Sequence, residues 1–166
     1  MVDKRQWPKP AAWAITQNER LWRESDATAD PEVIIEWSLG DSYRTHMMEP
    51  GDRAIFWITG RNGGLARVGF VLGVTRLRGG YWKDAYGRRH EAPYAGTFFM
   101  PPFPNQRYIH RDVFAERTKF EGCEVMGTAA QHQPPLRIEP TEWTVIKNVL
   151  LRFDRSARHT RSPWFG

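Results

Sequence analysis

Cysteine is almost absent from this sequence. Among 166 residues there is one, Cys123, which can form no disulfide within the chain and is too few for a zinc site built on thiolates. Long apolar runs are missing and the mean hydropathy is −0.62, which argues against a transmembrane helix. The first residues, MVDKRQWPKPAAW, lack the apolar stretch of a secretory signal. These absences predict a cytoplasmic protein that contacts no membrane.

Recognisable catalytic patterns are also scarce. The five histidines are scattered, with no pair at a metal-ligand spacing. The glycine-rich stretch 60–64 (GRNGG) lacks the Lys-Ser/Thr and the helix of a phosphate-binding loop. Cys123 lies in the stretch EGCE, where neighbouring carboxylates should raise the thiol pKa and disfavour a thiolate. We therefore expect no enzymatic activity, no metal and no cofactor.

Basic and aromatic residues, by contrast, are abundant. The chain has 24 Lys and Arg against 19 Asp and Glu, a net charge of +5, and a pI of about 9.7. Such a balance is compatible with nucleic acid, because Lys and Arg displace its condensed counterions. Eight Trp, five Tyr and nine Phe add flat rings that can stack on bases beside those cations. The composition thus favours a nucleic-acid partner without requiring one.

The length fits one domain with its own core. The expected elements, in chain order, are a strand at 11–16, a loop or short helix at 18–23, a further element at 31–37, a short helix at 43–48, a β-hairpin formed by 52–59 and 66–74 around the turn 60–64, and a strand at 112–120. Many strands with few helices predict an α+β, barrel-like fold.

Residues 78–104 form the longest stretch without a clear element. It holds Tyr81, Trp82, Tyr86, Tyr94 and four prolines. Uninterrupted loops of this length in compact domains are usually functional lids or disordered segments. We therefore interpret 78–104 as an insertion that could cover a site.

Both ends of the chain are basic. Residues 1–10 predict a flexible arm and 154–166 a basic tail, which leaves 11–153 as the domain. A final helix, capped by Thr141, closes that domain. Its apolar stripe at helical spacing predicts core packing by Trp143, Ile146, Val149, Leu150 and Phe153.

Three stretches, in order, resemble the EVE domain of the PUA-like superfamily, which also contains the YTH readers. The first is the strand and polar turn WAITQN at 13–18. The second runs from WSLG at 37–40 through HMMEPGD at 46–52 to the strands 54–59 and 68–71. The third is LRIEPTEW at 136–143. The resemblance covers about residues 11–153, although the 78–104 insertion has no counterpart in it.

The resemblance implies a PUA-like mixed β-barrel with a few short helices and a C-terminal helix, which holds a flipped, modified base in an aromatic cage. Trp37 would supply one wall and Ser38 a polar contact. Asn18 would offer an amide to the base edge, and Trp57 would form the pocket floor. Purely structural roles stay open for three of these residues: core packing for Trp57 and Trp37, and helix capping for Asn18.

The long segment is expected to complete the site. Tyr81 or Trp82 would form the second wall, with an exposed or lid-packing ring as the alternative for Trp82. Phosphate contacts are assigned to Arg76, Arg78, Arg88 and Arg89, although surface arginines often serve only solvation.

The expected function is therefore that of a reader of 5-methylcytosine or 5-hydroxymethylcytosine in DNA, with a nuclease or restriction system as a possible partner by analogy. The open alternatives are a reader of RNA or of N6-methyladenine, and a small nuclease or hydrolase that uses residues 78–112, where RYIHRD at 107–112 faintly resembles nuclease loops. An interaction module whose aromatic cleft holds a protein or small ligand is the third.

Overall fold

A computed structural model describes residues 8–18, 33–83, 86–103, 108–127 and 135–153. Its elements, in order, are β1 (Ala12–Asn18), β2 (Ile34–Leu39), α2 (Tyr43–Met47), β3 (Arg53–Thr59), β4 (Gly64–Arg76), β5 (Tyr81–Lys83), β6 (Arg89–Glu91), β7 (Tyr94–Phe99), β8 (Ile109–His110), α3 (Asp112–Ala115), the short 3-10 turns η2 (Thr118–Phe120) and η3 (Glu124–Met126), β9 (Leu136–Ile138) and α4 (Pro140–Phe153).

One mixed sheet organises the molecule. Its strand order is β2-β7-β4-β3-β1-β9, and β8 adds to β4. β1 and β3 run parallel, whereas the other pairs are antiparallel. The fold is thus mixed α+β, as the strand-rich pattern predicts. Within the described residues the sheet stays open between β2 and β9, so the finer expectation of a PUA-like mixed β-barrel is not confirmed.

Three sequence predictions are confirmed by the first half of the chain. The predicted hairpin is β3 and β4, whose register shifts at Phe56/Trp57 through a bulge or irregularity. The first strand and the short helix at 43–48 are β1 and α2. Ser42 caps α2 by accepting a hydrogen bond from the Thr45 amide at 3.3 Å. The predicted loop or short helix at 18–23 lies outside the described residues except for Asn18.

The long segment 78–104 is not one loop, which corrects that prediction. Residues 94–99 of this segment form β7, which lies between β2 and β4 in the sheet. Gly96 hides this strand from a propensity argument, because glycine is rare in strands. A Cβ there would lie 2.6 Å from the Phe98 ring, so a larger residue at this position would require the buried Phe98 ring to shift.

The predicted strand at 112–120 is also wrong. Residues 112–115 form α3 and residues 118–120 form η2. Phe114 and Phe120 are both fully buried and both contact Trp57. Two short turns bring these rings to one side just as an alternating strand would, so the sequence pattern fits either structure.

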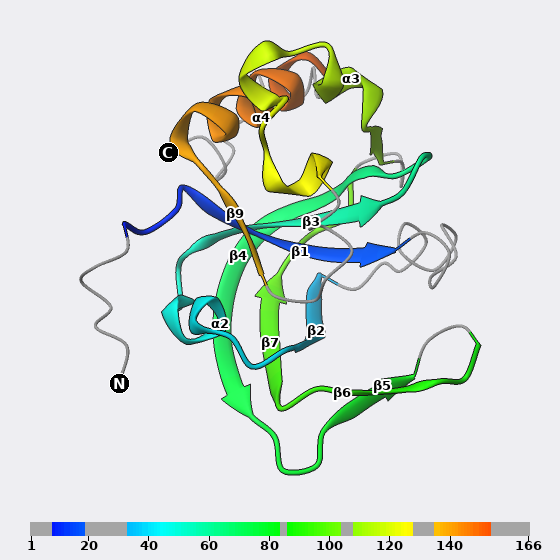
Figure 1. Cartoon of the computed structure of the whole chain (residues 1–166). Helices are drawn as coiled ribbons and strands as arrows, with labels where there is room; N and C mark the ends of the chain where they lie inside the picture. The colour runs from blue at the N-terminus through cyan, green and yellow to red at the C-terminus, as the bar shows by residue number, and fades with distance from the viewer. Residues whose placement is uncertain (1–7, 19–32, 84–85, 104–107, 128–134, 154–166) are drawn as a thin grey trace.

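The sheet separates two hydrophobic cores. On one side, α3, η2, η3 and α4 cover the sheet and form the helical core. On the other side lies the inner core, which includes Trp13, Phe56 and Phe98. Figure 1 shows α3 and α4 together at one end of the molecule and β5–β6 at the other.

The final helix follows its prediction with two corrections. Trp143, Ile146, Val149 and Leu150 are buried, but Phe153 is 61% exposed at the end of the helix and leaves the predicted stripe. Thr141 does not cap the helix. Instead Glu142 accepts a hydrogen bond from the Glu139 amide at 2.7 Å, while the Glu139 carbonyl accepts from the Trp143 amide.

The predicted terminal segments fall mainly on residues 1–7 and 154–166, outside the described part of the chain. Residues 8–10 of the predicted arm are described, and they contact the domain. Lys9 forms ion pairs of 2.7 Å with Glu49 and Asp52, and Asp52 also accepts from the Trp13 indole at 3.0 Å. Lys9 is therefore held against the domain by two ion pairs.

Candidate functional site

A pocket of about 430 Å³ lies where the parallel strands β1 and β3 end side by side. Its volume falls in the usual range of about 300–1,000 Å³ for small-molecule sites. The described lining consists of Asn18, Thr59, Gly60, Arg61, Arg111, Asp112, Val125, Met126 and Gly127. Of the residues proposed from sequence, the pocket contains Asn18 alone.

The register of β1 on β3 places Asn18. Asn18 pairs with Thr59 at the last position of both strands, and the Thr59 hydroxyl donates to the Gln17 carbonyl at 3.3 Å. The amide is therefore at the pocket edge because β1 runs out there. Its group can both donate and accept hydrogen bonds, as a base edge requires.

Two arginines in this pocket were missed by the sequence analysis. Arg61 is exposed in the turn between β3 and β4, and Arg111 is half-buried after β8. Arg111 donates to the Gly60 carbonyl at 2.9 Å, which fixes it beside that turn. Asp112 is the one carboxylate of the described lining, so its net charge is positive and suits an anion. Arg111 belongs to the basic stretch RYIHRD at 107–112, which already stands out in the sequence. Nothing in the sequence places this stretch near Asn18, and only the fold brings the two together.

Trp57 is removed from the candidate site. Trp57 is 1% exposed. Its ring centroid lies 5.3 Å from that of Phe114 and 5.9 Å from that of Phe120, in the helical core. Trp37, in contrast, packs on the inner core. The two tryptophans thus lie on opposite faces of the sheet, so Trp57 cannot form the floor of a pocket walled by Trp37.

Trp37 and Ser38 are adjacent residues of β2 and point to opposite faces of the sheet. The half-buried Trp37 ring packs edge-on against Phe56, with centroids 5.1 Å apart and planes at 78°. Leu39 returns to the inner core with Trp37. The Ser38 side chain therefore does not share a face with Trp37, which corrects the expectation that both side chains contact one base.

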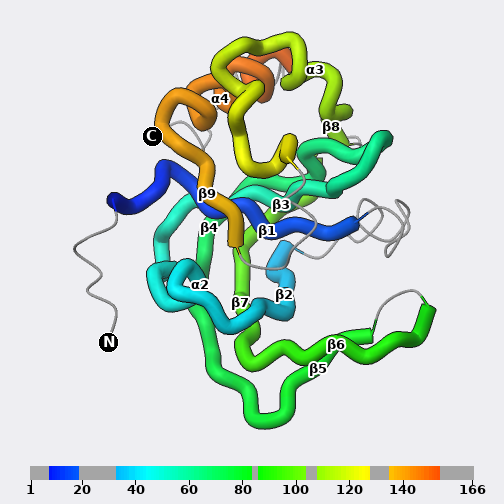
Figure 2. Tube along the Cα trace, viewed as in Figure 1, coloured from blue at the N-terminus to red at the C-terminus, as the bar shows by residue number. Residues whose placement is uncertain are grey.

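The strands β5 and β6 form a hairpin arm, defined here as the described residues 76–83 and 86–94, that continues from the ends of β4 and β7. Figure 2 shows the chain leaving β4 through this arm and returning into β7. Trp82 stacks on His90, its cross-strand partner, with centroids 4.3 Å apart and planes at 15°.

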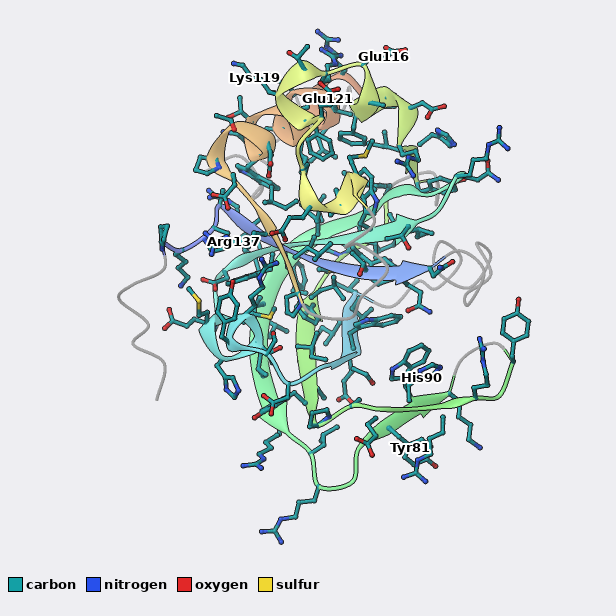
Figure 3. The ribbon with its side chains drawn as sticks, in the orientation of Figure 1. Tyr81, His90, Glu116, Lys119, Glu121 and Arg137 are labelled. Atoms are coloured by element: carbon teal, nitrogen blue, oxygen red, sulfur yellow. The ribbon has the colours of Figure 1, made fainter. Side chains whose placement is uncertain are left out.

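The two faces of the arm separate Tyr81 from Trp82. Figure 3 shows His90 pointing from the arm toward the main sheet and Tyr81 pointing away from it. Since Trp82 stacks on His90, the Trp82 ring shares the inward face. Trp82 remains the candidate for a second wall, whereas Tyr81 is excluded from that role.

The arginines proposed for phosphate contacts all lie on this arm. Arg76 ends β4 and Arg78 follows it, and both are exposed. Arg88 lies over the Tyr86 ring at 5.2 Å and Arg89 over the Tyr81 ring at 3.9 Å. These four residues form one basic region that is separate from the pocket of Asn18, Arg61 and Arg111.

Cys123 has no features of a reactive thiol. It is 2% exposed in the helical core, and burial raises the pKa of its thiol far above the ordinary value. Glu142 and Glu124 raise that pKa further. Across the described ranges no group of three or more His, Cys, Asp or Glu side chains could hold a metal ion. None of the described helices is long and apolar enough to cross a membrane.

Comparison with known proteins finds other proteins of similar fold but none that indicates a chemical activity. No protein-family model matches the sequence, and neither does any curated protein. Solved structures are similar in fold. A hypothetical protein from Leishmania major is 12% identical with a TM-score of 0.56, over 87% of this chain and 97% of that one. Proteins from Pseudomonas syringae and Pseudomonas putida are each 14% identical with a TM-score of 0.58, over 84% of this chain and 99% of theirs. At these identities the likeness establishes a shared fold alone.

Proposed function

We propose that this protein is an EVE-type, PUA-like module that reads a modified nucleobase in nucleic acid, namely 5-methylcytosine or 5-hydroxymethylcytosine in DNA. The observation that carries the proposal is the pocket that joins Asn18 to Arg61 and Arg111. An amide that matches a base edge lies there beside two cations that suit phosphates. This combination fits a nucleotide better than an apolar ligand or a protein segment.

In this proposal the aromatic residues supply the binding energy. A flipped base costs a few kcal/mol to unstack, and stacking returns about 1–3 kcal/mol per base. The described lining of that pocket contains no aromatic ring. The rings assigned to this role are therefore outside it: Trp37 on β2 and Trp82 on the inward face of the arm. One additional methyl group covered by such rings should give a preference of about 10- to 200-fold.

Trp37 is the residue that tests this role. We expect the wild-type protein to bind an oligonucleotide with the modified cytosine more tightly than its unmodified twin, with affinity falling as salt rises. Trp37→Ala should remove the preference and keep weak, salt-dependent binding. Fluorescence anisotropy with modified C or modified A, in DNA and in RNA, at two salt concentrations measures both quantities.

Arg111→Gln is the matched comparison. This substitution removes a cation and leaves every aromatic ring in place. It should therefore weaken the binding of modified and unmodified oligonucleotides equally, and reduce the slope of log affinity against log salt by about 1. Equal wild-type affinity for all modified and unmodified forms would contradict the proposal. If Trp37→Ala unfolds the protein in a thermal melt, Trp37 is a core residue. Metal-dependent strand cleavage would favour the nuclease alternative.

A further inference from the structure

Backbone hydrogen bonds hold the two sides of the hairpin arm together at its base. At its base the Leu77 amide donates to the Pro93 carbonyl at 2.7 Å and the Ala92 amide to the Gly80 carbonyl at 2.9 Å. Ala92 is 1% exposed. A Cβ on Gly80 would lie 2.3 Å from the Ala92 carbonyl oxygen, so the two chains approach as closely as glycine permits. The arm therefore leaves the sheet in a defined direction.

The outward face of the arm differs chemically from the inward one. Strand alternation places Tyr81, Lys83, Arg89 and Glu91 together on this outward face. Tyr81 is 48% exposed, and the Arg89 guanidinium lies 3.9 Å above its ring. The donors of a guanidinium lie in its own plane, so an arginine stacked on a ring can still bind phosphate through its edge.

Charge is concentrated in this arm. Residues 76–91 contain five Lys or Arg and two Asp or Glu, an excess of three charges, where the whole chain has an excess of five. Glu91 is the one carboxylate among the described residues of the outward face. Figure 3 shows Tyr81 pointing away from the body of the protein. A nucleic-acid strand whose base lies against the inward face of the arm is on the other side from Tyr81 and Arg89. The outward face is therefore left for a second nucleic-acid strand.

We propose that the arm enters the major groove of double-stranded DNA. Its inward face then contacts one DNA strand, and its outward face contacts the complementary DNA strand. The groove, about 12 Å wide and 8.5 Å deep, admits a two-stranded β-ribbon. Three residues per strand at about 3.3 Å each span about 10 Å, which matches that depth. The major groove of duplex RNA is too deep and narrow for side chains. This inference rests on the proposed nucleic-acid function and identifies its substrate as duplex DNA.

Lys83 and Arg89 test the outward face, since they are a cross-strand pair of exposed cations. The probes are unmodified oligonucleotides of one sequence, as duplex DNA, single-stranded DNA and duplex RNA. Wild-type protein should bind duplex DNA most tightly. K83Q/R89Q should bind duplex DNA at least about tenfold more weakly, with the salt slope reduced by about two, and single-stranded DNA within about twofold of wild type.

The matched control is K119Q/R152Q, which removes two exposed cations of η2 and α4. These elements lie at the opposite end of the molecule from the arm, so all three affinities should stay within about twofold of wild type. Three results would overturn the inference. The first is that K83Q/R89Q binds duplex DNA as tightly as wild type does, and the second is that it loses as much affinity for single-stranded DNA as for duplex DNA. The third is that the control K119Q/R152Q loses as much affinity for duplex DNA as K83Q/R89Q does.

The outcome separates this inference from the proposed function. The modified-to-unmodified affinity ratio tests the reader, whereas the arm variants are tested on unmodified DNA. A preserved ratio with no effect of K83Q/R89Q overturns the arm alone. A ratio of one with an arm-dependent duplex preference overturns the base reader alone. Absence of binding to every nucleic acid overturns both.

Discussion

Glu124 holds three segments of the chain through one carboxylate. Its oxygens accept from the Arg44 guanidinium at 2.5 and 2.8 Å and from the Arg137 amide at 2.8 Å, which joins η3 to α2 and β9. Burial alone would raise the pKa of Glu124, but the hydrogen bonds from Arg44 and Arg137 outweigh it, and the pKa lies below its ordinary value of 4.5.

Glu124→Gln should therefore destabilise the protein by about 1–2 kcal/mol at neutral pH, because a charged, two-pronged hydrogen bond is lost. A carboxylate whose pKa is lowered on folding contributes stability above pH 4.5 and loses it as the pH falls through the folded pKa. The difference from wild type should thus shrink between pH 4.5 and the folded pKa. Urea denaturation at several pH values measures it, with exposed Glu36→Gln as control. A penalty that persists unchanged in acid would refute this account.

At the scale of elements, the hairpin arm depends on one glycine at its base. The Cβ of Gly80→Ala would meet the Ala92 carbonyl oxygen at 2.3 Å and the Leu77 Cβ at 2.8 Å. We expect the bond between the Ala92 amide and the Gly80 carbonyl to open, while the free energy of unfolding changes by less than about 1 kcal/mol because the arm lies outside the main sheet.

Hydrogen exchange tests this directly. In Gly80→Ala the Ala92 amide should exchange faster while amides of β3 stay protected. The control is Gly73→Ala, because a Cβ there has nothing within 4 Å. Unchanged protection of the Ala92 amide in Gly80→Ala would show that the base of the arm tolerates a side chain.

Element prediction from this sequence succeeds where periodicity and turn residues agree. The β3–β4 hairpin is of this kind. The apolar spacing also predicted α4, although its Thr141 cap and the burial of Phe153 were predicted wrongly. β7 was missed because Gly96 and its flanking prolines weaken the strand signal. The segment 112–120 was assigned wrongly because Phe114 and Phe120 are spaced evenly, and a pattern of two rings does not define the backbone between them.

At the scale of the whole molecule, one sheet couples two cores. Neighbouring residues of β3 face opposite ways: Phe56 belongs to the inner core and Trp57 to the helical core. The inner side also buries a cation, Arg67, which is 3% exposed and donates to the Met100 carbonyl at 3.0 Å. Neither core can lose its packing without disturbing strands that serve the other.

We therefore expect a single unfolding transition. Trp57→Ala in the helical core and Phe98→Ala in the inner core should each destabilise the same transition by about 3–5 kcal/mol. Urea curves followed by far- and near-ultraviolet circular dichroism should coincide for both variants. Two separated transitions, each sensitive to one variant, would show that the cores unfold independently.

The sequence by itself determined the class of the fold, the main hairpin, the final helix and an excess of basic and aromatic residues. These are properties of local pattern and composition, which do not depend on how strands pair. Tertiary structure alone decided which rings share a face. It put Trp57 in the helical core, Ser38 opposite Trp37, and Tyr81 opposite Trp82. It also brought Arg61 and Arg111 to Asn18, because strand order and register join residues far apart along the chain, and no local pattern encodes that pairing.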